Sequence, residues 1–372
     1  MKNVRPWSIL VLIAMAAVLI HPTAAMQGAG QGVTLLLQAL IPSLLPFMIL
    51  CRLLTDSGLV QAAGRKLYGV TGRLFGAGGE MSLAIVLSII CGYPTGAKLV
   101  GSLYQDGRIP KERLTHHALL CSTASPVFVL ATVGAGMLVQ PSLGRIILVS
   151  HIAACLLLGL RPHRGRPLPP APAAAGREAP PPPLGTALAR AVADSCLAML
   201  QVGGYVILFS VILAILRQSG WLHSLASLGA AMLSLEPASV EALLTTLLEM
   251  SNGCQAIASC GAPLRWQCAA LAFAVSWGGL SIACQSLGLL SGAPIRPVRF
   301  LLGKLAQGIL AAALCYMMLG FVELPAFAPI GQGIWGEAFT PVVSLAGIQL
   351  CALTLFLLWI WQEKRKKTQN FE

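Results

Sequence analysis

Long apolar segments separated by short polar ones make up most of this chain. About eight of them match the thickness of a bilayer and predict spanning helices, at residues 7–26, 33–53, 118–140, 143–160, 195–217, 267–290, 301–321 and 341–361. Lipid offers the backbone no hydrogen-bond partners, and the residue-by-residue alternation of barrel strands is missing. We therefore expect an all-α polytopic membrane protein, with the lipid bilayer as its first partner.

Two further apolar segments, residues 81–104 and 241–261, are each interrupted near the middle. The interruptions, at residues 92–96 and 251–253, leave arms of about ten residues, too short to cross a membrane. Each segment therefore predicts a re-entrant hairpin. Amphipathic stretches at residues 59–75 and 221–235 precede the hairpins and are expected to lie at the membrane surface.

A proline-rich segment, residues 161–190, divides the chain and predicts a cytoplasmic linker. Each half contains a span, an amphipathic stretch, a broken hairpin and another span, and the halves start from opposite sides of the membrane. This order predicts an inverted repeat. The expected parts are a signal-anchor span, the first repeat, the second repeat and a C-terminal pair of spans with a basic tail, at residues 1–32, 33–160, 191–292 and 293–372.

Composition and charge support a membrane protein and exclude a nucleic-acid partner. Apolar residues make up 56% of the chain and charged residues 10%, while the formal net charge is +12. The basic residues lie in short loops beside apolar spans, so they report topology and place both termini in the cytoplasm. The eleven cysteines are scattered through apolar segments without metal-ligand spacing, and we interpret them as small hydrophobic residues.

Candidate binding residues gather at four helix breaks: the two hairpin tips and the spans that follow them. Four half-helix N-termini near the midplane would form a positive, hydroxyl-rich pocket for a small anion. Lys98 and Glu249 are the ionisable residues nearest the tips and are expected to pair across this pocket. The candidates are Gly92, Tyr93, Pro94, Thr95, Gly96, Lys98, Ser122, Thr123, Ser125, Pro126, Glu249, Ser251, Asn252, Gly253, Ser276, Gly278 and Gly279.

Simpler interpretations of the same residues stay open. The breaks could be kinks whose backbone groups are satisfied by neighbouring helices. Lys98 and Glu249 could instead extend to opposite membrane surfaces.

Enzyme motifs are not found. The chain contains no HExxH, no GxSxG turn and no P-loop, and Gly331, Gly333 and Gly336 match GxGxxG only in a loop between predicted spans. We expect neither an enzyme nor a bound cofactor or metal.

Three groups of residues together resemble a known family. They are residues 91–98 with 106–109, residues 122–126 with 134–137, and residues 249–253. They resemble the YlbJ-type (SpoVV) sporulation integral membrane proteins over nearly the whole chain. The resemblance implies Gate, or nucleoside recognition, repeats and a fold similar to concentrative nucleoside transporters. It also implies movement of dipicolinic acid from the mother cell across the outer forespore membrane. Ser125 departs from the pattern, in which a smaller residue precedes the proline.

The residues and the resemblance agree on a small organic anion. The predicted function is transport of dipicolinate by a multi-pass protein of the mother-cell-derived outer forespore membrane. A non-transport sporulation scaffold or gating subunit, and a nucleoside transporter, remain as alternatives. A homo-oligomer is also compatible with the sequence.

The charge distribution predicts the side on which each loop lies. Residues 107–111 and 161–190 should be cytoplasmic and residues 261–266 external, because Lys and Arg near span ends stay on the cytoplasmic side. Single-cysteine labelling in intact cells measures this. An external signal at residues 107–111 would make residues 81–104 a true span and remove the inverted repeat.

Overall fold

The computed structural model describes residues 7–76, 79–160 and 182–321. Within these ranges every regular element is a helix. Five helical segments are long and apolar enough to cross a bilayer: Pro22–Asp56, Pro141–Gly159, Leu184–Gln218, Leu264–Leu289 and Pro297–Phe321. The expected all-α, multi-pass membrane fold is confirmed. The predicted span at residues 341–361, the glycine motif from Gly331 to Gly336 and most of the linker lie outside the described residues.

The first half begins with a short apolar helix and one long helix, and continues through a hairpin to a broken span. Its elements are α1 (Trp7–Ile20), α2 (Pro22–Leu35), the π-helical η1 (Leu36–Leu40), α3 (Ile41–Asp56), α4 (Leu59–Phe75), α5 (Gly79–Cys91), α6 (Thr95–Gln105), α7 (Lys111–Leu120), the π-helical η2 (Phe128–Met137) and α8 (Pro141–Gly159).

The second half repeats this order. Its elements are α9 (Leu184–Gln218), α10 (Trp221–Leu233), α11 (Pro237–Leu248), α12 (Met250–Ser259), α13 (Leu264–Trp277), α14 (Gly279–Leu289), α15 (Pro297–Met318) and the 3₁₀ turn η3 (Leu319–Phe321). Helix α15 therefore holds in the second half the place of α8 in the first.

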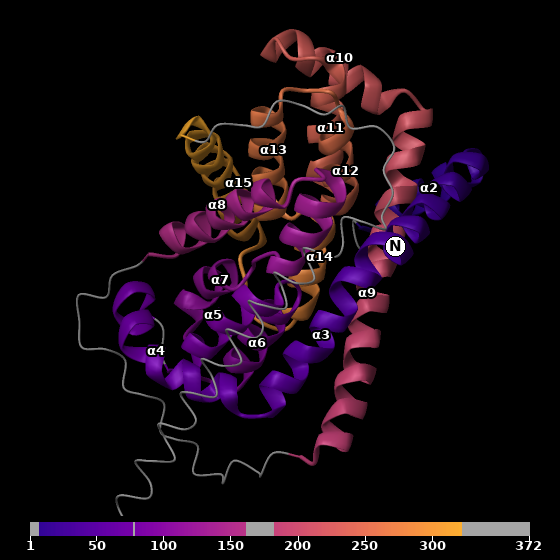
Figure 1. The fold of residues 1–372 in the computed structure, drawn as a ribbon. Helices are drawn as coiled ribbons and strands as arrows, with labels where there is room; N and C mark the ends of the chain where they lie inside the picture. The colour runs from indigo at the N-terminus through magenta and orange to yellow at the C-terminus, as the bar shows by residue number, and fades with distance from the viewer. Residues whose placement is uncertain (1–6, 77–78, 161–181, 322–372) are drawn as a thin grey trace, which may run out of the picture.

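The two halves point in opposite directions. Helices α4 and α10 lie at opposite ends of the bundle, each beside the hairpin of its own half (Figure 1). The chain turns by 118° between α10 and α11, which sets α10 across the end of the bundle. Helices α13 and α15 pack together, and both contact α8, so the core is built from both halves.

The start of the chain differs from its sequence prediction. Residues 7–26 and 33–53 were expected to be two separate spans, but α1 ends at Ile20 and residues 22–56 form one continuous helical run. The glycines are used for close packing and not for a turn. A Cβ on Gly28 would lie 2.7 Å from the Ser210 carbonyl oxygen, and one on Gly32 would lie 2.8 Å from the Ile207 Cα.

Gly28 and Gly32 therefore form a small-residue seam that lets α2 approach α9 backbone to backbone. This four-residue spacing is the common device for helix contact in lipid, where apolar burial alone does not drive association. Gly30, between them, faces away from α9, and a Cβ there meets nothing within 4 Å.

The seam predicts opposite effects for two substitutions one half-turn apart. Gly28→Ala should destabilise the protein by about 1–3 kcal/mol through overpacking. Gly30→Ala should be neutral or stabilising by up to about 1 kcal/mol, since alanine is the better helix former. Melting temperatures of the two purified variants in detergent measure this. Equal melting temperatures would show that the seam is not a tight contact.

Candidate functional site

The first hairpin tip packs directly on the broken span that follows it. Gly92 adopts a positive φ of 73°, and a Cβ there would overlap the backbone of Ser125. A Cβ on Gly96 would overlap the carbonyl oxygen of Cys121. The Thr123 hydroxyl donates to the Ser88 carbonyl oxygen at 2.6 Å. Glycine at the tip thus permits a close contact between two backbone segments, and the broken span supplies a hydrogen-bond donor to the tip.

The second tip and its broken span repeat this arrangement. Gly279 has a positive φ of 77°, and a Cβ there would lie 3.0 Å from the Leu248 carbonyl oxygen and the Met250 nitrogen. The Trp277 indole N–H donates to the Leu247 carbonyl oxygen at 3.2 Å. The break itself lies at Glu249, whereas the sequence placed it at residues 251–253. Those residues form the first turn of α12.

Glu249 is the N-cap of α12. Its Oε2 accepts hydrogen bonds from the Asn252 backbone N–H at 2.7 Å and from the Asn252 side chain at 2.9 Å. The Asn252 side chain also donates to the Ser210 hydroxyl at 2.8 Å, which ties this tip to α9. An acidic cap complements the positive end of the helix, so this N-terminus is already occupied by a carboxylate.

Two buried side chains join the halves. His151 of α8 accepts a hydrogen bond at Nε2 from the Ala124 backbone N–H at 3.0 Å, and its Nδ1 lies 2.7 Å from the Ser276 hydroxyl oxygen. Because Nε2 accepts, the proton of the neutral ring is on Nδ1, which donates to Ser276. One imidazole thus bridges the two broken spans.

Lys304 of α15 is the second bridge. Its side chain is 2% exposed, and Nζ donates to the Ser122 carbonyl oxygen at 2.7 Å, the Tyr93 hydroxyl at 2.9 Å and Gln307 Oε1 at 3.0 Å. The Tyr93 hydroxyl donates in turn to the Val275 carbonyl oxygen at 3.3 Å. A single ammonium therefore holds the first tip and the first break, and through Tyr93 it reaches the second broken span.

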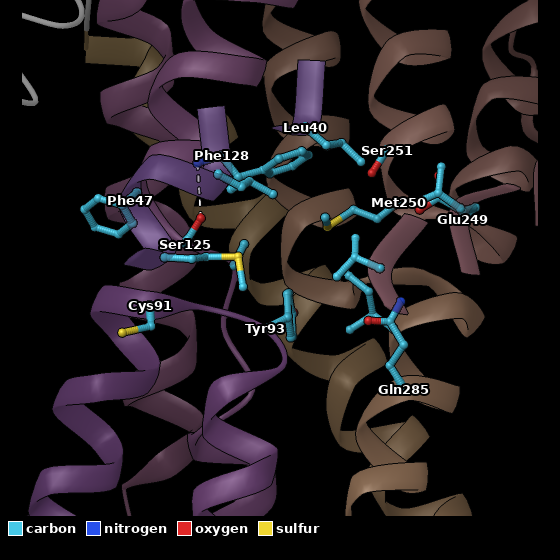
Figure 2. A pocket seen from close by; sticks show the side chains of 16 residues that line it. Leu40, Phe47, Cys91, Tyr93, Ser125, Phe128, Glu249, Met250, Ser251 and Gln285 are labelled. Atoms are coloured by element: carbon cyan, nitrogen blue, oxygen red, sulfur yellow. Dashed lines mark hydrogen bonds between the residues drawn. The ribbon is translucent and has the colours of Figure 1, made fainter. Parts of the chain in front are cut away.

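A narrow cavity of about 50 Å³ lies between the tips and the first long helix. Figure 2 shows the Tyr93 ring and the Glu249 side chain on its wall, with Gln285 nearby. Its polar lining residues are Tyr93, Ser125, Glu249, Ser251 and Gln285, and its apolar ones are Leu40, Leu44, Phe47, Met48, Cys91, Ala124, Phe128, Val202, Val206, Met250 and Ile282. A space of this size holds a few water molecules, which need roughly 10–15 Å³ each by this measure. An aromatic solute requires the walls to separate.

The structure sorts the sequence candidates into three groups. Tyr93, Ser125, Glu249 and Ser251 line the cavity. Others build the tips and breaks behind it: Gly92, Pro94, Thr95, Gly96, Ser122, Thr123, Pro126, Asn252, Gly253, Ser276, Gly278 and Gly279. Lys98 does neither.

The expected pair of Lys98 and Glu249 is not formed. Lys98 is exposed, whereas Glu249 is 1% exposed and is bound by Asn252. The buried face of α6 is made by small and apolar residues, Gly96, Ala97, Val100 and Gly101, and Lys98 falls on the opposite face. The cation of the site is Lys304, which the sequence analysis missed. A lysine inside the predicted span at residues 301–321, one turn before Gln307, was the available signal.

The four half-helix N-termini are also not equivalent. Glu249 caps α12, and the Ser125 hydroxyl accepts from the Phe128 backbone N–H of η2 at 3.2 Å. Helices α6 and α14 begin after Pro94 and Gly278 without a side-chain cap. Of the four N-termini in the expected positive pocket, two thus carry a side-chain cap and two do not, and the cation beside the cavity is Lys304.

Known proteins resemble this chain in sequence and in structure. Residues 37–149, from η1 to α8, match the family described as Gate, nucleoside recognition. The chain is 28% identical to the sporulation integral membrane protein YlbJ of Bacillus subtilis (strain 168) over 329 residues. The aligned region covers 82% of this chain and 80% of that protein. The resemblance expected from the sequence is confirmed. A structure of CNTnw in an outward-facing state is similar with a TM-score of 0.48 and 14% identity, over 84% of this chain and 87% of that one.

The cap at Glu249 predicts a graded effect of substitution. Glu249→Ala should cost about 0.5–2 kcal/mol of stability, because the Asn252 N–H loses its acceptor in a buried site. Glu249→Gln keeps an acceptor oxygen and should cost less. Thermal unfolding of both variants in detergent measures the difference, and an equal loss in both would mean that the charge matters more than the hydrogen bond.

Proposed function

We propose that this chain carries a small organic anion across a membrane and that its substrate is dipicolinate. Lys304 carries this proposal. A charge inside a membrane bundle is costly and marks a place where the charge of a solute is recognised. The Lys304 ammonium donates to the Tyr93 hydroxyl, and Tyr93 lines the cavity, so the positive charge lies one side chain behind the cavity wall.

The cavity lining suits a flat aromatic acid. Phe47, Tyr93 and Phe128 offer ring surfaces on which a pyridine ring can stack. Ser251 and Gln285 offer hydroxyl and amide donors for its carboxylates. Glu249 adds little repulsion, because its charge is complemented by Asn252 and by the α12 N-terminus.

Spore formation is the biological setting that we propose. YlbJ of Bacillus subtilis is named as a sporulation integral membrane protein, and this chain is similar to it over most of its length. The proposed place is the mother-cell-derived outer forespore membrane, with both termini in the cytoplasm of the mother cell. Dipicolinate would move towards the forespore as one repeat moves against the other around the cavity.

A nucleoside is the competing substrate. The matched family is described as nucleoside recognition, and the cavity presents an acid and an amide, Glu249 and Gln285, that could bind hydroxyl groups of a ribose. A nucleoside carries no negative charge, however, and would leave Lys304 uncompensated. A membrane scaffold without transport activity is the third possibility.

Uptake by the purified protein separates these functions. Proteoliposomes should accumulate labelled dipicolinate above protein-free liposomes, unlabelled dipicolinate should compete, and uridine should compete poorly because it lacks charge. Uridine competing as well as dipicolinate would favour the nucleoside transporter. No uptake of either would favour the scaffold.

Deletion in a spore-forming host tests the biological setting. The mother cell should still make dipicolinate, but the spores should contain little of it. Assay of dipicolinate in purified spores and in mother-cell lysates measures both pools. Normal spore content in the deletion strain would contradict the proposal.

A further inference from the structure

The hydrogen bonds of Lys304 use all of its protons. A charged lysine has three N–H donors, and three oxygen atoms lie 2.7–3.0 Å from Nζ. The acceptors are a hydroxyl, a backbone carbonyl and an amide, all of them neutral. Among the described residues, no carboxylate lies within ion-pair distance of this ammonium.

The other titratable groups nearby are already committed. His151 holds its proton on Nδ1 because Nε2 accepts from Ala124. The Cys155 thiol donates to the Leu120 carbonyl oxygen at 3.3 Å. Tyr93 accepts from Lys304 itself, and Glu249, on the cavity wall, is bound by Asn252. Lys304 is therefore the group here whose charge can change through the loss of one of three hydrogen bonds to neutral acceptors.

Loss of one proton would loosen the contact between tip and break. A neutral amine has two N–H donors for the three oxygens, and its lone pair would face an oxygen lone pair. At least one link, to Tyr93 of the tip, Ser122 of the break or Gln307, must then open.

Two further hydrogen-bond donors belong to residues that bind the Lys304 ammonium. Ser122 Oγ and Gln307 Nε2 are buried, and neither has a hydrogen-bond partner among the described residues. Both belong to residues that already hold the ammonium. They provide the N–H and O–H donors that the lone pair of a neutral amine needs, so the neutral state can also be satisfied after a small rearrangement.

We propose that Lys304 is the proton-coupling site of this transporter. The charged amine holds the first tip against the first break, and an anion in the cavity compensates its charge. On release of the anion, the ammonium N–H bond breaks, the electron pair stays on nitrogen, and the proton passes through the Tyr93 hydroxyl to water in the cavity. The protein then returns with a neutral amine, so each anion moves together with a proton. The direction of coupling rests on the proposed function.

Transport in sodium-free proteoliposomes tests the coupling. An inward proton gradient should raise dipicolinate accumulation several-fold in the wild-type protein. Lys304→Gln should lose this stimulation, and its exchange of labelled for unlabelled dipicolinate should need a higher dipicolinate concentration, because the charge that the anion compensates is gone. Lys98→Gln, an exposed lysine on the tip helix α6, is the matched control and should behave as wild type. A sodium requirement, gradient-driven uptake by Lys304→Gln, or loss of the stimulation in Glu249→Gln with Lys304 intact would overturn the proposal.

A second measurement does not depend on the substrate. Cys91 lines the cavity beside the first tip, so its alkylation, followed by mass spectrometry, reports the opening of that tip. The ratio of the wild-type alkylation rate to that of Lys304→Gln should be below one at low pH, because only the wild-type protein has the charged link that keeps the tip closed. The ratio should approach one as the pH rises and Lys304 loses its charge. The ratio cancels the ionisation of the thiol itself.

Lys304→Arg covers the case in which the glutamine variant fails to fold. A permanent charge should keep the tip closed at every pH and abolish gradient-driven uptake. A pH-dependent ratio without dipicolinate uptake would reject the substrate and keep the coupling site. A ratio that does not change with pH would reject the coupling site whatever the substrate.

Discussion

Backbone groups at a helix break inside a membrane must find partners within the protein, and this constraint shapes the centre of the fold. The four breaks supply partners to one another: Thr123 donates to the carbonyl oxygen of Ser88, and Trp277 to that of Leu247. Such pairing requires backbone to lie on backbone. Gly96 and Gly279 stand at these contacts because a larger residue would push the segments apart.

The side chains that join the two halves follow from the same constraint. His151 satisfies the Ala124 N–H in one broken span and reaches Ser276 in the other. Lys304 satisfies the Ser122 carbonyl oxygen. Both side chains come from helices at matching places in the inverted repeat, α8 and α15. Each half therefore contributes one polar residue to the interface between the halves. These residues stabilise the irregular backbone, and they also give the interface between the halves two groups that could respond to a proton or an anion.

This arrangement explains why a site for a solute can form where the chain is least regular. Irregular backbone exposes N–H and C=O groups, and the cavity lies against two such segments. Its narrowness means that binding and motion are linked, because an aromatic solute cannot enter unless the cavity walls separate. The ammonium meets the first tip through one hydrogen bond, to the Tyr93 hydroxyl, and such a bond can be exchanged for another at lower cost than apolar packing can be lost.

The sequence alone determined the class of fold, the two hairpins and three of the four breaks, because span length, broken apolar runs and proline or glycine placement are local properties. It missed the continuous helix at residues 22–56, since glycines that mark a turn and glycines that pack on a partner helix look alike in one dimension. It also chose Lys98 over Lys304. Which lysine faces the centre depends on which face of its helix is buried, and Lys304 meets Tyr93 across 211 positions of the chain. Only the tertiary structure decides such a contact, because the breaks that need a cation are brought together by packing and not by their order in the sequence.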